Sequence, residues 1–144
     1  MARNTIKLSG FKEAHDALGT FKKSTERALL RRVATRALEP FVERAKQLVP
    51  VNEGNLRDSI SIGTKLTRGA RREAKRDPVQ GVRMFAGTAN RNGVPREFGS
   101  VRSAPDPFMR PAWDSLKNSM AQSVLDDLGQ EIERTAQRAR KRSK

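Results

Sequence analysis

Two stretches of the chain repeat apolar residues at steps of three and four, which is the spacing of amphipathic helices. The first begins near Ser24, and its apolar stripe comprises Leu29, Leu30, Val33, Ala37, Phe41, Ala45 and Leu48. Pro40 lies inside this stripe, where a proline removes a hydrogen bond and crowds the preceding turn, so we predict a kink between Arg36 and Pro40. Pro111 suits the first turn of the second helix, whose stripe comprises Trp113, Leu116, Met120, Val124, Leu128 and Ile132.

A short strand and a short helix are predicted before the first long helix. Residues 5–8 alternate between polar and apolar side chains, as a strand does. Ser9 can cap a helix that carries Phe11, Ala14 and Leu18 on one face and that ends at Gly19.

Two strands are predicted between the long helices. Residues 55–59 read as a helical turn that leads into a strand with Ile60, Ile62 and either Lys65 or Leu66 on its period of two. A second strand is predicted over residues 79–88, with a bulge at Gly81. We expect the two strands to pair antiparallel.

This order of elements predicts an α+β fold, in which a small antiparallel sheet packs against the long kinked helix and the long C-terminal helix. At 144 residues the chain is large enough for one modest core, so we predict a single domain over residues 1–133. Within it a basic loop at about residues 67–78 joins the two strands. A basic and flexible tail is predicted for residues 134–144.

The segment from Pro95 to Trp113 is unusual in combining proline with aromatic residues. It contains four prolines, two phenylalanines and the only tryptophan of the chain. So much proline disfavours a regular helix or a central strand, whereas the aromatic side chains are too apolar for a solvated loop. We therefore predict a stiff loop that docks either onto the domain's own core or onto another subunit.

The chain carries a net charge of +14, which favours a polyanionic neighbour such as nucleic acid, an acidic protein surface or anionic lipid. A solvated surface that only keeps the protein soluble is the equally weighted alternative. The basic residues that we consider for contact with DNA or with an acidic surface are Arg68, Arg71, Arg72, Lys75, Arg76, Arg138, Arg140, Lys141 and Arg142.

Several classes of protein are disfavoured by composition. The chain has no cysteine, which excludes disulfides and thiolate metal sites, and it has no apolar run of the roughly 20 residues that span a bilayer. Its N-terminus lacks the apolar region of a secretory signal, so we expect folding in a cytosol.

Enzymatic activity is also disfavoured. The one histidine, His15, cannot build a multi-histidine metal site, and we predict that it lies on a helix surface. The acidic pairs Asp126-Asp127 and Glu131-Glu133 are predicted to lie on solvated helix faces. We expect no catalytic residue, no metal and no cofactor.

Three motifs, taken in order, resemble those of a tailed-bacteriophage family. They are GNLRDSI at residues 54–60, REFG at residues 96–99 and APDPFMRPAW at residues 104–113. The chain resembles the neck or tail-completion family, which includes the minor tail protein Z group of lambdoid phages.

The resemblance implies a non-enzymatic virion protein, made in the host cytoplasm, that forms a hexameric ring at the head-tail junction. Such a ring joins tail to head and lets the genome pass. The implied partners are other copies of the chain, head-closure or connector proteins, tail terminator or tube proteins, and genomic DNA in the lumen, but no membrane. The main alternative is a small basic protein that binds nucleic acid through sequence-independent phosphate contacts.

For the ring we expect certain residues to form the subunit interface or to dock the proline-rich loop. They are Arg57, Glu97, Phe98, Phe108, Met109, Arg110 and Trp113. The aromatic members would dock the loop, and the charged members would fix it through ion pairs. The alternative is that these side chains close the domain's own core.

Overall fold

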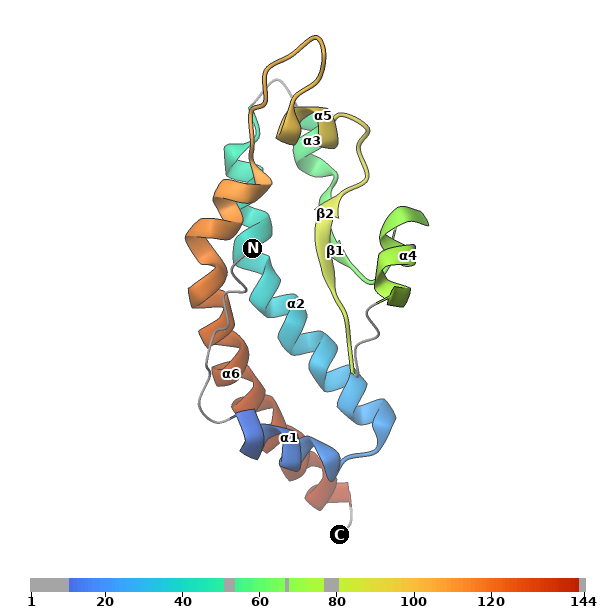
Figure 1. Ribbon diagram of the computed structural model, residues 1–144. Helices are drawn as coiled ribbons and strands as arrows, with labels where there is room; N and C mark the ends of the chain where they lie inside the picture. Colours follow the sequence, from blue (N-terminus) through green and yellow to red (C-terminus); the bar gives the residue numbers. More distant parts are fainter. Residues whose placement is uncertain (1–10, 51–53, 67, 77–80, 143–144) are drawn as a thin grey trace.

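A computed structural model describes residues 11–50, 54–66, 68–76 and 81–142 (Figure 1). Its elements are α1 (Phe11–Gly19), α2 (Lys23–Leu48), α3 (Gly54–Asp58), β1 (Ile60–Gly63), α4 (Arg68–Arg76), β2 (Phe85–Thr88), α5 (Gly93–Phe98) and α6 (Met109–Arg142). This is the α+β fold that the sequence predicts.

The long helices α2 and α6 lie side by side and run in opposite directions (Figure 1). Helix α1 crosses the lower end of this pair in Figure 1, whereas the β1–β2 hairpin lies against α2 near the other end. The strands pair antiparallel, with Ile60 opposite Thr88 and Gly63 opposite Phe85. A two-stranded sheet is marginal alone, and packing against α2 supplies its apolar support.

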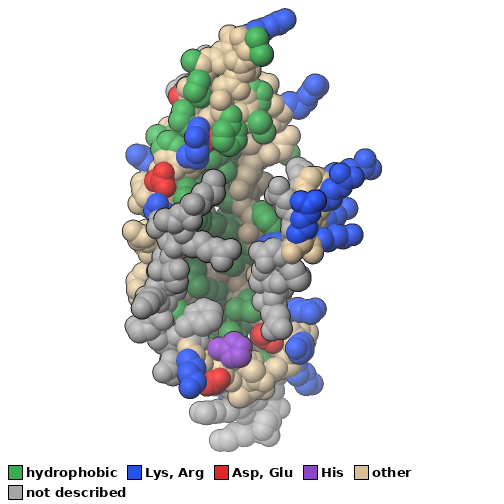
Figure 2. Space-filling model, viewed as in Figure 1, with side chains coloured by type: hydrophobic (Ala, Val, Ile, Leu, Met, Phe, Trp, Pro, Cys, Tyr) green, Lys and Arg blue, Asp and Glu red, His purple; other side chains and the backbone are tan. Residues whose placement is uncertain are grey.

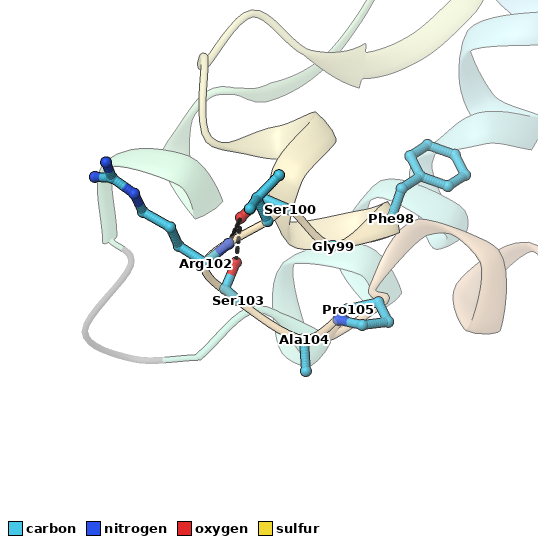
Figure 3. A pocket seen from close by; sticks show the side chains of 8 residues that line it. Phe98, Gly99, Ser100, Arg102, Ser103, Ala104 and Pro105 are labelled. Carbon is cyan, nitrogen blue, oxygen red and sulfur yellow. Dashed lines mark hydrogen bonds between the residues drawn. The ribbon is translucent and has the colours of Figure 1, made fainter.

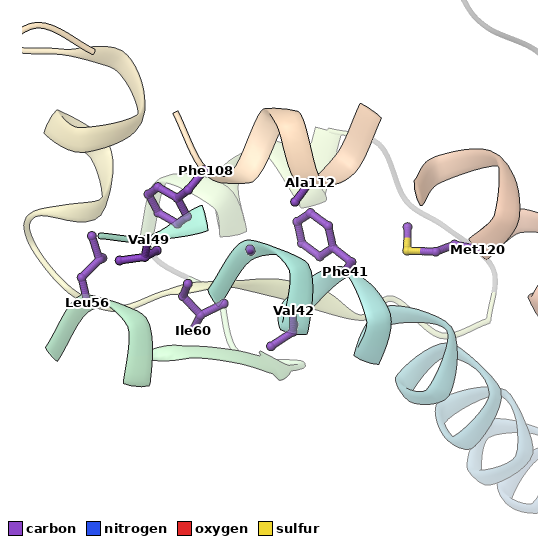
Figure 4. Close-up of a cluster of buried hydrophobic side chains, with 9 residues drawn as sticks. Phe41, Val42, Val49, Leu56, Ile60, Phe108, Ala112 and Met120 are labelled. Carbon is purple, nitrogen blue, oxygen red and sulfur yellow. The ribbon is translucent and has the colours of Figure 1, made fainter. Parts of the chain in front are cut away.

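The main core lies where the hairpin, α2 and the start of α6 meet (Figure 4). Its buried members are Phe41, Val42, Ala45, Val49, Leu56, Ile60, Phe108, Ala112 and Met120. A second buried cluster, nearer α1, comprises Leu18, Leu29, Val33 and Leu128. The apolar stripes of both long helices therefore face each other, as their spacing predicts.

The two strands are shorter than the alternation predicts. β1 ends at Gly63 rather than near Lys65, and β2 begins at Phe85 rather than at Val79. Gly81 lies outside both strands at a bend with φ of 108°, a backbone conformation that glycine tolerates best. The predicted strand at residues 5–8 lies outside the described residues, and the kink at Pro40, through which α2 continues, stays a prediction.

Two segments that were predicted to be irregular are helical. The basic segment expected as a loop forms α4, and α6 continues to Arg142 through the segment expected as a tail. Arginine, lysine, alanine and glutamine are strong helix formers, and residues 130–142 contain neither glycine nor proline. A high positive charge therefore did not exclude a helix in either place, because arginine and lysine have high helix propensity.

Replacement of Phe108 tests the main core. Its side chain is 1% exposed, so Phe108→Ala is expected to lower the free energy of unfolding by about 3–5 kcal/mol. Phe98, only ten residues earlier and 62% exposed, is the matched control. Phe98→Ala should cost less than about 1 kcal/mol in denaturant unfolding. Equal losses for the two variants would contradict this placement of Phe108.

Candidate assembly interface

The N-terminus of α6 lacks a cap from its own sequence. The first backbone N–H groups of a helix have no intrahelical acceptor, and a preceding Ser, Thr, Asp or Asn commonly supplies one. Here the residue before Met109 is Phe108, which has no acceptor in its side chain. The missing acceptor has to come from elsewhere in the fold.

Glu97 on α5 supplies it. Its Oε2 accepts the N–H groups of Phe108 at 2.8 Å and of Met109 at 2.9 Å, and its Oε1 accepts the N–H of Arg110 at 2.9 Å. The Glu97 carboxylate therefore caps α6 from a different helix. A negative charge at this end also interacts favourably with the helix dipole.

The Arg110 side chain adds two further hydrogen bonds between α6 and Glu97 of α5. Its Nε donates to Glu97 Oε1 at 3.0 Å, and its Nη2 donates to the Glu97 backbone carbonyl at 2.8 Å. The same guanidinium lies 4.9 Å from the centre of the Phe98 ring, within the range of a cation–π contact. Arg110 thus ties the last turn of α5 to the first turn of α6.

The environment of Glu97 lowers its pKa. Burial by itself raises the pKa, because only 4% of the residue is exposed, but the hydrogen bonds from Met109, Arg110 and Phe108 outweigh it. The net pKa lies below the ordinary value of 4.5, so the carboxylate is ionised at neutral pH.

The loop between α5 and α6 is held as an arch. Arg96 Nη2 lies 2.8 Å from Asp106 Oδ2, and the Asp106 N–H donates to the Arg96 carbonyl at 2.8 Å. Ser100 and Ser103 exchange backbone hydrogen bonds at the far end of the arch. Their hydroxyl groups also lie 2.9 Å apart, within hydrogen-bond distance (Figure 3). Gly99 has φ of 83°, and a Cβ there would lie 3.0 Å from Pro105 Cδ, so this turn requires glycine. An open pocket is lined by residues 98–105 of the arch itself.

Apolar side chains are exposed around this junction. Val101 at the tip of the arch is fully exposed, and Phe98, Val94 and Trp113 are from about half to two-thirds exposed. Figure 2 shows hydrophobic side chains gathered at this end of the molecule. We call Val94, Phe98, Val101 and Trp113 the apolar end. Large exposed side chains that share one end of a molecule are typical of a contact surface.

The structure divides the residues predicted for docking into three groups. Phe108 is buried in the domain's own core, and Met109 packs against that core. Phe98 is largely exposed, whereas Trp113 is about half exposed and its ring meets Phe41 edge-on at 5.8 Å. Glu97 and Arg110 form the cap.

Arg57 does not join them, contrary to its predicted ion pair with the proline-rich loop. Its Nε pairs with its neighbour Asp58 at 3.1 Å on α3. The segment from Pro95 to Trp113 is also less irregular than predicted, because α5 takes in Pro95 and α6 begins at Met109.

The prediction that Glu131 lies on a solvated helix face is wrong, because Glu131 is a second buried carboxylate. Glu131 is 3% exposed, and its oxygens lie 3.1 Å from both Arg32 and Arg36 of α2 and 3.3 Å from Arg134. Burial raises its pKa, but the arginines outweigh this effect and lower it. The signal was available, since Glu131 follows Leu128 by three residues and so falls on the buried stripe of α6.

The basic residues predicted to contact DNA or an acidic surface are exposed wherever the structure describes their side chains. Arg68, Arg71, Arg72, Lys75 and Arg76 lie on α4, and Arg138 and Lys141 lie near the end of α6. The side chains of Arg140 and Arg142 lie outside the described residues.

Nothing in the described part of the chain assembles a metal centre, since no three acidic or histidine side chains there converge. His15 lies exposed on α1, as predicted, with Nδ1 3.7 Å from Asp16. Among the helices that the structure describes, none is long and apolar enough to cross a membrane.

Residues 12–91 match the family described as "Bacteriophage HK97-gp10, putative tail-component". The match covers more than half of the 144 residues. The chain belongs to this family. Neither the curated proteins nor the solved structures include a significant match.

Membership of the HK97-gp10-like family confirms the resemblance to phage tail proteins and points to a structural role rather than an enzymatic one. The matched segment runs from α1 past β2 and includes GNLRDSI. The capping junction between α5 and α6 lies beyond it. The geometry of this junction is therefore a separate observation from the family match.

Acidification tests the Glu97 cap. Because the folded-state pKa is lowered, ionised Glu97 stabilises the fold above pH 4.5, and this stabilisation is lost as pH falls through the folded-state pKa. Glu97→Gln should lower the free energy of unfolding by about 1.5–3 kcal/mol at pH 7. The difference from wild type should shrink toward pH 3 in denaturant titrations.

Glu133→Gln, at an exposed position of α6, is the matched control and should change stability by less than about 0.5 kcal/mol. If the difference between wild type and Glu97→Gln stays constant from pH 7 to pH 3, the charge of Glu97 does not provide the stabilisation.

Proposed function

We propose that this tail component is a structural virion protein that assembles into a homo-oligomeric ring at the head-tail junction. In this role it joins tail to head and leaves a passage for the genome. Membership of a phage tail family supports the structural role, and the resemblance of the REFG and APDPFMRPAW motifs to tail-completion proteins suggests the junction. Hexameric symmetry and contact with head-closure and tail-tube proteins are parts of the same proposal.

The proposal of self-assembly rests mainly on the apolar end. Its four side chains come from α5, the arch and the first turns of α6, which Glu97 and Arg110 hold together. Exposed aromatic and aliphatic groups on a fixed scaffold need little ordering when they bind a partner. The centres of oligomer interfaces are enriched in such residues.

The arch also suits an interface, because it holds an exposed apolar side chain in a fixed position. It presents Val101 at its tip while Arg96 and Asp106 close its base, so the exposed side chain projects from a braced loop. In a ring, the apolar end of one subunit would contact a different surface of the next, which is the head-to-tail contact that closes by rotation.

Replacing exposed apolar residues should abolish assembly without unfolding the protein. Sedimentation velocity is expected to show an oligomer for wild type and a monomer for the double variant Phe98→Ser and Val101→Ser. Both side chains are largely exposed, so thermal stability should change by only a few degrees.

Gln130→Ser, at an exposed position on α6 away from this end, is the control and should assemble as wild type does. Negative-stain images of the wild-type oligomer should show rings. A wild-type protein that stays monomeric at its highest soluble concentration, or a double variant that still forms rings, would contradict the proposal.

A further inference from the structure

Helix α4 carries its positive charge on one face. Residues 68, 71, 72, 75 and 76 follow the i, i+3, i+4, i+7, i+8 spacing that lines up side chains along a helix. All five are arginine or lysine, and all five are exposed. The stripe runs the length of the nine-residue helix, or about 13 Å at 1.5 Å per residue.

The other positions of α4 are small or acidic. They are Gly69, Ala70, Glu73 and Ala74. An interfacial membrane helix needs bulky apolar residues opposite its basic face, and a helix that binds in a protein groove needs apolar anchors at similar positions. Helix α4 has neither, so its partner must be recognised by charge.

The position of α4 leaves this face open. The helix lies in the connection between β1 and β2, on the side of the hairpin away from α6 (Figure 1). Figure 2 shows its Lys and Arg side chains projecting from one edge of the molecule, with further basic side chains on the same edge over the first turns of α2. Exposed basic residues in that part of the chain are Lys22, Lys23, Arg27 and Arg31.

We propose that the basic face of α4 contacts the phosphate backbone of duplex DNA without sequence preference. Duplex DNA carries about one negative charge per 1.7 Å of helix axis, so a stripe about 13 Å long meets several phosphates at once. Release of the condensed counterions favours this contact and needs no apolar centre. A specific protein interface, in contrast, is built around a core depleted in charge.

This inference goes beyond the proposed ring and does not depend on it. One α4 binds weakly, because few phosphates are neutralised. Where copies assemble, repetition of the same face raises the effective affinity for a single duplex. The arginines make no base contacts in this arrangement, so binding is equal for duplexes of different sequence.

Fluorescence anisotropy with a labelled mixed-sequence duplex, recorded across a salt series, tests the contact. The test variant combines Arg72→Gln, Lys75→Gln and Arg76→Gln. The control variant combines Lys12→Gln, Arg44→Gln and Arg91→Gln, which lie at exposed positions off α4 and remove the same charge from the same residue types. Circular dichroism checks that both variants keep their helix content.

Wild type should lose affinity steeply with salt and bind a second duplex of different sequence equally well. The test variant should bind at least tenfold more weakly at about 0.1 M salt, and its slope of log affinity against log salt should fall by about 2–3. The control variant should keep a slope within about one unit of wild type. Equal losses in both variants would overturn the assignment to α4 and leave only an effect of net charge.

Absence of duplex binding at low salt would also overturn the proposal. If polyglutamate bound to wild type and not to the test variant in that case, the face would be assigned to an acidic protein surface. The same titrations in the Phe98→Ser and Val101→Ser background separate the two proposals. DNA binding that persists in this background, although weaker, shows that α4 of a single subunit binds DNA by itself. Sedimentation of the α4 variant shows whether the ring still forms without the basic face.

Discussion

The structure depends on one carboxylate placed where a helix cannot cap itself. Glu97 accepts three backbone N–H groups at the start of α6 and a further hydrogen bond from Arg110. This contact sets where α6 begins, and the position of Phe108 in the main core follows from it, since its own N–H is one of the donors. The exposed aromatic residues on either side are held by the same cap.

A second buried carboxylate braces the other half of the helix pair. Glu131 of α6 meets Arg32 and Arg36 of α2 close to the smaller apolar cluster. An unpaired buried charge is costly, so each carboxylate restricts the fold to arrangements that keep its partners in place. The ionic contacts favour one register, and the core then packs in that register.

The two proposed contact surfaces lie mainly on segments outside the α2–α6 pair. The apolar end projects beyond its upper end in Figure 1, and the basic face of α4 projects from the hairpin. Helix α5 and the arch supply most of the apolar end, with Trp113 added from the start of α6, and the short helix α4 supplies the basic face. This separation of a buried frame from exposed surfaces agrees with the structural role that the phage tail-component family suggests.

The sequence by itself determined the two long helices, the antiparallel pair of strands and the family, because periodicity and motif order are local properties of the chain. Only the tertiary structure decided which aromatic residues face inward. Phe108 and Phe98 are alike in sequence, yet one is buried and the other exposed, since the cap at Glu97 turns the chain between them. It also decided which residues pair with the buried Glu131, because Arg32 and Arg36 lie on α2 and reach it only when α2 and α6 meet. Local spacing cannot show that.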